Sequence, residues 1–291
     1  AYDTVIASSG LLTVGKIQGY DGDPGKAIDP HVLAGGTAVV GGGFTAKGVT
    51  FSGAGVISGG TFDLGSVEDI TSAGTNIGGL FGGTQILSAG GTSLSDIFSG
   101  GTQLISGVNG GGYASGSIVS SGGKVDVYSA GILSAGTAAA GGTIMVESGG
   151  IVRGDVILAG GTEIVKSGGV VSSTTVSSGG TEIISSGGVA SRVTISSGGV
   201  EIVSAGGTAL SATISAGGTL SVVSGGTLGN TIVAGPVGST TSNGTFYPIG
   251  TGGLLVVHSG AVLNNTSMGW KAGIDVEGVR YAEGDTVTFS G

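Results

Sequence analysis

Three glutamates recur at a fixed interval in the second half of the chain, and they are the residues best placed to do chemistry. Glu163, Glu182 and Glu201 are evenly spaced and stand in the near-copies GGTEIV, GGTEII and GGVEIV. If each copy forms one coil of a stacked structure, neighbouring carboxylates lie about 5 Å apart, close to the spacing in a retaining glycosidase. An acid and a nucleophile need different surroundings, however, and these three have the same neighbours. We therefore predict an exposed acidic ladder, no catalytic residues and no enzyme activity.

Paired glycines surround these glutamates and reveal the period of the chain. From Gly123 to Gly226, the second glycine of each pair follows the previous one at sequence steps that alternate between 8 and 11, which gives a period of about 19 residues. A fixed period of this size is typical of a solenoid. The bends carry the glycine pairs because a positive φ or a close backbone approach is needed there. Looser copies precede these and begin at Thr37, Thr61, Thr84 and Thr102.

Three positions of the repeat unit hold mainly β-branched residues, which favour strands over helices. Each strand would pair with its copy one coil away, since only stacked coils bury their inward faces. The sequence therefore predicts an all-β fold: a right-handed single-stranded parallel β-helix (β-solenoid) of about 19 residues per coil with an end cap. The first column is Val127, Val146, Val165, Ile184, Val203 and Val222, the second is Ile132, Ile151, Val170, Val189, Thr208 and Thr227, and the third is Ala138, Ile157, Val176, Ile195, Ile214 and Val233.

The orientation of the glutamate column is a separate question. Each glutamate stands two positions before the first apolar column, so simple alternation along a strand would point it inward. Three unpaired buried carboxylates would be expensive. We therefore favour outward glutamates, with either a bend in the strand or the adjacent column as the inward one. That adjacent column is Ile164, Ile183 and Ile202.

The regularity of the repeat divides the chain into four predicted segments. Residues 1–36 form irregular N-terminal capping coils, 37–234 the regular solenoid and 235–253 a loop or bend that carries two of the four prolines. Residues 254–291 form final degenerate coils and a cap, in which Val257 and Met268 return to the apolar columns. Since the chain begins at Ala1, we expect a mature or trimmed fragment.

Composition excludes several classes of function. Eighteen acidic residues against nine basic ones give a net charge of −9, so no basic surface for nucleic acid is expected. Without cysteine there is no disulfide or thiolate site, and no apolar run is long enough for a direct membrane span. The segment Asp21–Asp29 begins like a calcium loop, but Lys26 stands where that loop needs glycine and Val32 where it needs glutamate. We predict no metal site and no cofactor.

The repeat GGTEIISSGGVASRVTISSGG resembles those of the AIDA-type self-associating autotransporter adhesins, the group of antigen 43 and TibA. This resemblance covers about two-thirds of the chain and implies a surface-exposed or secreted, outer-membrane-associated passenger. The implied role is adhesion, cell–cell autoaggregation and biofilm formation. The implied partners are a second copy on a neighbouring cell (homotypic contact) or cell-surface glycans or proteins of a host.

The repeats of some members of this group are glycoproteins with O-linked heptoses, so the resemblance also implies a heptosyltransferase as modifying enzyme. A turn-forming or strand-surface role is an alternative for any one candidate acceptor. Two other functions also stay open: a β-helical polysaccharide lyase or glycosidase, and a passive stalk that presents another domain. The candidate acceptors are Thr175, Thr194, Thr213, Ser178, Ser186 and Ser197.

Overall fold

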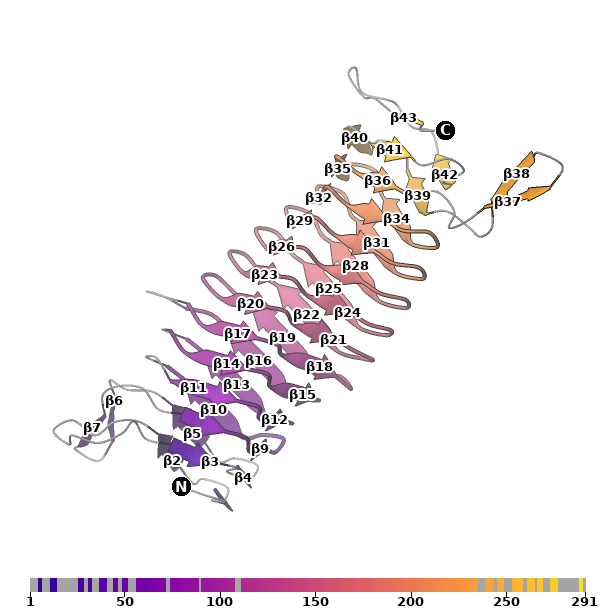
Figure 1. Ribbon diagram of the computed structural model, residues 1–291. Helices are drawn as coiled ribbons and strands as arrows, with labels where there is room; N and C mark the ends of the chain where they lie inside the picture. The colour runs from indigo at the N-terminus through magenta and orange to yellow at the C-terminus, as the bar shows by residue number, and fades with distance from the viewer. Residues whose placement is uncertain are drawn as a thin grey trace. The chain divides into compact units, whose positions relative to one another are not determined.

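The computed structural model describes residues 56–71, 74–88, 90–107, 111–234, 253–258, 261–264 and 266–267, together with the backbone of short strands outside these ranges. The chain divides into two compact units, Ala1–Arg153 (unit 1) and Gly154–Gly291 (unit 2). In each unit, short strands from successive coils stack into three parallel sheets (Figure 1). The predicted all-β parallel β-solenoid is thereby confirmed, whereas its handedness stays a prediction.

Unit 1 contains the less regular coils. Its sheet 1 consists of β2 (Leu11–Val14), β5 (Thr37–Val40), β10 (Val67–Ile70), β13 (Thr84–Leu87), β16 (Thr102–Ile105), β19 (Lys124–Val127) and β22 (Thr143–Val146). Its sheet 2 consists of β3 (Lys26–Ile28), β8 (Val56–Ser58), β11 (Thr75–Ile77), β14 (Thr92–Leu94), β17 (Tyr113–Ser115), β20 (Ile132–Ser134) and β23 (Ile151–Arg153). Its sheet 3 consists of β1 (Val5–Ile6), β4 (His31–Val32), β9 (Thr61–Phe62), β12 (Leu80–Phe81), β15 (Ile97–Ser99), β18 (Ile118–Ser120) and β21 (Thr137–Ala138). An antiparallel pair, β6 (Phe44–Ala46) and β7 (Val49–Phe51), lies outside these sheets.

Unit 2 contains the most regular coils. Its sheet 1 consists of β25 (Thr162–Val165), β28 (Thr181–Ile184), β31 (Val200–Val203), β34 (Thr219–Val222), β39 (Leu254–Val257) and β42 (Gly273–Val276). Its sheet 2 consists of β26 (Val170–Ser172), β29 (Val189–Ser191), β32 (Thr208–Leu210), β35 (Thr227–Gly229) and β40 (Val262–Asn264). Its sheet 3 consists of β24 (Val156–Ile157), β27 (Thr175–Val176), β30 (Thr194–Ile195), β33 (Thr213–Ile214), β36 (Ile232–Val233), β41 (Ser267–Met268) and β43 (Thr288–Phe289). β37 (Ser239–Ser242) and β38 (Thr245–Pro248) pair antiparallel.

The register of the sheets matches the predicted period. In unit 2, Thr181 pairs with Thr162 on one side and with Val200 on the other, so its partners stand one predicted period away in each direction. One of the looser copies was misplaced, because Thr61 lies in sheet 3 rather than sheet 1. The strand between β5 and β13 in sheet 1 begins at Val67 instead. A glycine pair followed by threonine therefore marks a bend of the coil but does not specify which bend.

Burial tests the three predicted apolar columns. The first and third are confirmed, because their described members are fully buried in the core. The second lies on stacked strands, as predicted, but faces outward: its residues open the strands of sheet 2 and are exposed or partly exposed, whereas the next residue of each strand points inward. Val257 returns to the buried first column, as predicted, and pairs with Val222. In the six coils of this column, the inward residues of sheet 2 are Leu133, Val152, Val171, Ala190, Ala209 and Leu228.

The two glycines of a pair have different structural roles, as Gly179 and Gly180 illustrate. Gly179 has φ = +76°, a conformation that costs other residues about 1–2 kcal/mol. Gly180 is buried, and a β-carbon there would lie 2.4 Å from the carbonyl oxygen of Ile157 in the previous coil. Both predicted reasons for the paired glycines, positive φ and close backbone approach, are therefore confirmed. The side chains of the segment Asp21–Asp29 and of residues 268–291 in the predicted cap lie outside the described residues.

Candidate functional surface and buried acidic ladder

The structure overturns the prediction of an exposed acidic ladder. Glu163, Glu182 and Glu201 pair with one another on β25, β28 and β31, and all three side chains are fully buried. Their strands alternate regularly, so the glutamates and the first apolar column both point inward. The adjacent isoleucines, Ile164, Ile183 and Ile202, are partly exposed. The regular alternation of the strands places the glutamates inside. The cost of burying them is lowered because a buried carboxylate can bind a proton and become neutral.

The environment of the ladder favours the neutral form of each carboxyl group. Burial raises the pKa of Glu201 to about 8, and burial together with Asp155 raises the pKa of Glu163 well above its ordinary value. For Glu182, burial and the neighbouring Glu201 raise the pKa in the same direction. Thr174 Oγ1 donates a hydrogen bond to Glu163 Oε2 at 3.2 Å. Among the described residues, no hydrogen-bond partner is present for either carboxyl oxygen of Glu182 or Glu201.

This burial argues against a glycosidase role for these three glutamates. A catalytic carboxyl group must contact the scissile bond directly, or through one water molecule. The three side chains have no exposed surface in the structure. Their mutual spacing therefore has no catalytic consequence, and the ladder is part of the core.

Unit 1 carries a second buried polar network at the same strand position, which the sequence analysis did not identify. Gln85 Nε2 donates to Glu68 Oε2 at 2.8 Å and to Asp96 Oδ2 at 2.6 Å. Gln103 Nε2 donates to Gln85 Oε1 at 2.7 Å, and Asn76 Nδ2 donates to Glu68 Oε1 at 2.6 Å. The strands VEDI, TQIL and TQLI carried the signal, because each has a polar residue at the position of the repeated glutamate.

The pKa values of the two acids in this network, Glu68 and Asp96, are also raised. Burial, followed by the nearby Asp96, raises the pKa of Glu68 to about 8, although hydrogen bonds from Asn76 and Gln85 oppose this. Burial raises the pKa of Asp96, which accepts hydrogen bonds from Ser93 Oγ and from the backbone N–H of Gly79, each at 2.7 Å. Hydrogen-bond donors thus accompany the acids in unit 1.

The predicted acceptor residues lie on the outside of unit 2. Thr175, Thr194 and Thr213 pair in register as the first residues of β27, β30 and β33, so they form a ladder along sheet 3. These three side chains are exposed or partly exposed. Ser178, Ser186 and Ser197 are exposed at glycine bends. All six are accessible to a modifying enzyme, and their glycosylation stays a prediction.

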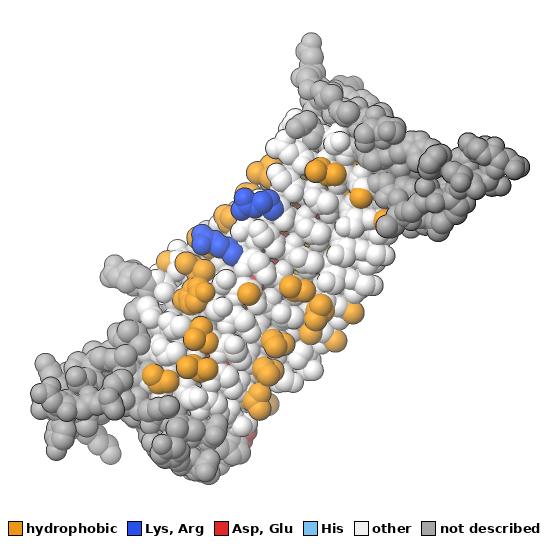
Figure 2. Space-filling view, in the orientation of Figure 1, with side chains coloured by type: hydrophobic (Ala, Val, Ile, Leu, Met, Phe, Trp, Pro, Cys, Tyr) orange, Lys and Arg blue, Asp and Glu red, His pale blue; other side chains and the backbone are white. Residues whose placement is uncertain are grey.

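The corresponding position of sheet 3 is apolar in part of unit 1. Leu80, Ile97 and Ile118 pair in register on β12, β15 and β18, and their side chains are 49%, 37% and 39% exposed. Figure 2 shows exposed hydrophobic side chains in rows that follow the stacking direction. We call these three residues the apolar ladder. Its signal in the sequence is an apolar residue directly before each of the buried residues Phe81, Phe98 and Val119.

The described ranges hold neither a metal site nor a membrane-spanning helix. No group of three or more His, Asp or Glu side chains there is arranged to hold a metal ion. Those ranges also contain no helix with the length and apolar character that a bilayer crossing requires.

The architecture of this chain recurs in a known protein. No family model and no curated protein matches the chain. A search of solved structures finds the hyper-glycosylated TibA55-350 fragment, whose glycosylation is catalysed by TibC, at a TM-score of 0.71 and 25% identity. The match covers 100% of this chain and 98% of that one.

The chain is similar to TibA over its full length. TibA is a member of the adhesin group that the repeat resembles, so the likeness supports the resemblance inferred from the sequence. It suggests an adhesin-type autotransporter passenger and implies a surface or secreted location.

Proposed function

We propose that the protein is an adhesin: a surface-exposed autotransporter passenger that holds cells together through repeated lateral contacts. The observation that carries this proposal is the full-length structural similarity to the TibA fragment. The preferred partner is a second copy on a neighbouring cell, with cell-surface glycans or proteins of a host as the other partners. Autoaggregation and biofilm formation follow from such contacts.

The outward ladders support a mechanism based on many weak contacts. The apolar ladder and the ladder of Thr175, Thr194 and Thr213 each repeat one side chain per coil. A second copy has the same coil spacing of about 4.8 Å, so contacts can form at every coil in register. Contacts linked in this way act together, and the avidity greatly exceeds the affinity of any one of them.

The charge of the chain favours these faces for contact. The formal net charge of the chain is −9, and two such acidic molecules repel each other over most of their surfaces. The apolar ladder has no ionisable group, and its half-exposed side chains lose water contact when they are covered. Two copies of the chain can therefore approach each other most easily at the apolar ladder.

Glycosylation belongs to the same proposal. TibA is glycosylated by TibC, and a related heptosyltransferase would modify the exposed hydroxyl groups of this chain. Intact-mass measurement on protein from its native host tests this. A series of heptose-sized increments supports modification, whereas a single unmodified mass contradicts it for that host.

The adhesive role is tested with beads that are coated with the chain. Coated beads should aggregate, and the variant Leu80→Thr/Ile97→Thr/Ile118→Thr should aggregate less, because it gives unit 1 the hydroxyl ladder of unit 2. Retained thermal stability of the variant is the control. Beads that stay dispersed, with glycosylated and with unmodified chain alike, would favour the stalk alternative.

A further inference from the structure

The carboxyl groups of the acidic ladder in unit 2 are buried, and most of their oxygens have no hydrogen-bond partner among the described residues. Glu163, Glu182 and Glu201 occupy three consecutive coils in register and are fully buried. Five of their six carboxyl oxygens have no hydrogen-bond partner among the described residues, and the sixth, Glu163 Oε2, accepts one hydrogen bond from Thr174 Oγ1. Such an arrangement would be strongly destabilising for three ionised groups.

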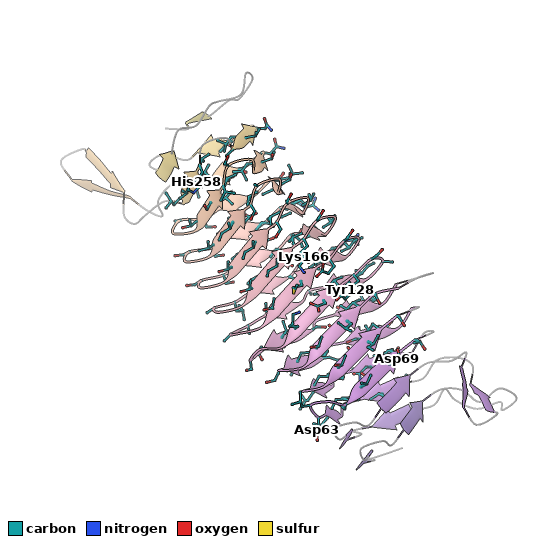
Figure 3. The ribbon with its side chains drawn as sticks, turned by 180° about the vertical axis from the view of Figure 1, so that it is seen from behind. Asp63, Asp69, Tyr128, Lys166 and His258 are labelled. Carbon is teal, nitrogen blue, oxygen red and sulfur yellow. The ribbon has the colours of Figure 1, made fainter. Side chains whose placement is uncertain are left out.

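The described interior beside the ladder contains no positive charge. The inward residues of sheet 2 there are Val171, Ala190 and Ala209, and those of sheet 3 are Val176, Ile195 and Ile214. Further inward residues lie between these sheets, namely Asp155, Thr174, Val193 and Ala212, and the only ionisable one of these four, Asp155, can only add negative charge. The cations of these coils lie at the surface: Lys166 is partly exposed (Figure 3) and Arg192 is exposed.

We propose that Glu163, Glu182 and Glu201 form a proton-operated switch, in which the coils of unit 2 close with all three carboxyl groups protonated and open when the protons are lost. A protonated carboxyl group has an O–H donor, so acids in neighbouring coils can satisfy one another. Ionised carboxylates have acceptors alone and repel. The three groups interact, so their protons leave in coupled steps that belong to the ladder as a whole.

The direction of the pH effect follows from linkage. The folded groups hold their protons to a higher pH than the unfolded ones, whose pKa has the ordinary value of 4.5. The stability that the protonated ladder contributes to unit 2 is therefore complete below pH 4.5 and is lost as the pH rises through the folded pKa, which is about 8 for Glu201. For each proton involved, the opening equilibrium constant rises by up to ~10-fold per pH unit within this window.

Unit 1 differs at this strand position, where its one titrating residue, Glu68, accepts hydrogen bonds from Asn76 and Gln85. At the same strand position it places Gln85 and Gln103, whose amide groups donate hydrogen bonds and do not titrate. Glutamine has the shape of glutamic acid, so this interior accommodates an uncharged amide at that position. Unit 2 has the titrating form of the same side chain in three successive coils.

The test uses the full chain and hydrogen–deuterium exchange, corrected for the intrinsic pH dependence of exchange, between about pH 5 and about pH 9. Protection of β25, β28 and β31 should fall as the pH rises. The variant Glu163→Gln/Glu182→Gln/Glu201→Gln should remove most of this fall. The control Glu147→Gln, which alters a partly exposed glutamate of unit 1, should leave it unchanged.

A second measurement keeps the proposal testable if the triple variant does not fold. The infrared C=O band of protonated carboxyl groups should be present at neutral pH in the native chain, and the single variant Glu182→Gln should weaken it. Absence of this band at neutral pH would overturn the proposal. Equal loss of protection in the native chain and the triple variant as the pH rises would do the same.

Discussion

Gln85 Nε2 lies 2.8 Å from Glu68 Oε2 and donates a hydrogen bond to it in the interior of unit 1. The same nitrogen donates to Asp96 Oδ2 at 2.6 Å. One amide group therefore stabilises two buried acids that would otherwise lack these donors.

Replacement of Gln85 by leucine should destabilise unit 1. Each buried acceptor that loses its donor costs about 1–3 kcal/mol, and Gln85 serves both Glu68 and Asp96. Urea unfolding followed by circular dichroism measures the loss. Gln103→Leu is the matched control, because Gln103 Nε2 donates to an amide oxygen, Gln85 Oε1, and a hydroxyl oxygen, Ser93 Oγ, and to neither acid. If both variants lose the same stability, the acids do not depend on Gln85.

The stability of unit 1 should also fall as the pH rises, because the pKa of Glu68 is raised from 4.5 to about 8. The contribution is complete below pH 4.5 and is lost progressively up to about pH 8. The full loss is on the order of 5 kcal/mol, since each pKa unit corresponds to about 1.4 kcal/mol. Thermal melts across this range measure it. Glu68→Gln should flatten the profile, and an unchanged profile would show that Glu68 does not titrate in this window.

Truncation of Phe81 should open the aromatic core of unit 1. Phe81 stacks between Phe62 and Phe98, with ring centroids 4.3 Å and 4.8 Å apart, and is 2% exposed. Phe81→Ala should cost about 3–5 kcal/mol in unfolding free energy, because it leaves a cavity between two rings. The neighbouring Leu80→Ala is the control, since Leu80 is 49% exposed. Similar losses for the two variants would contradict this account of the core.

A methyl group at Gly180 should push neighbouring coils apart. Its β-carbon would lie 2.4 Å from the backbone oxygen of Ile157, and a backbone atom cannot move aside cheaply. We expect Gly180→Ala to cost more than Gly154→Ala, whose site has φ = +74° but open space around it. The control variant should lose about 1–2 kcal/mol through its backbone conformation alone. Urea unfolding ranks the two, and the reverse order would contradict the close-approach role of Gly180.

The sequence determined the architecture of this protein because the relevant forces are local and periodic. The alternating short and long steps between glycine pairs placed the bends, and β-branched residues at Val165, Ile184 and Val203 marked an inward column that the structure confirms. A residue that repeats once per coil must face its own copy in the next coil. The parallel ladders therefore followed from the period.

The tertiary structure alone decided which polar residues are inside. Alternation along the strand predicted an inward Glu182, whereas the cost of a buried charge predicted an outward one. The sequence could not decide between them, because the answer depends on the protonation state of Glu182 in the interior. Likewise, Thr61 and Thr84 both follow a glycine pair, yet they lie in different sheets. A local signal identifies a bend, whereas the packing of whole coils determines its place in the cross-section and the charge of the groups inside.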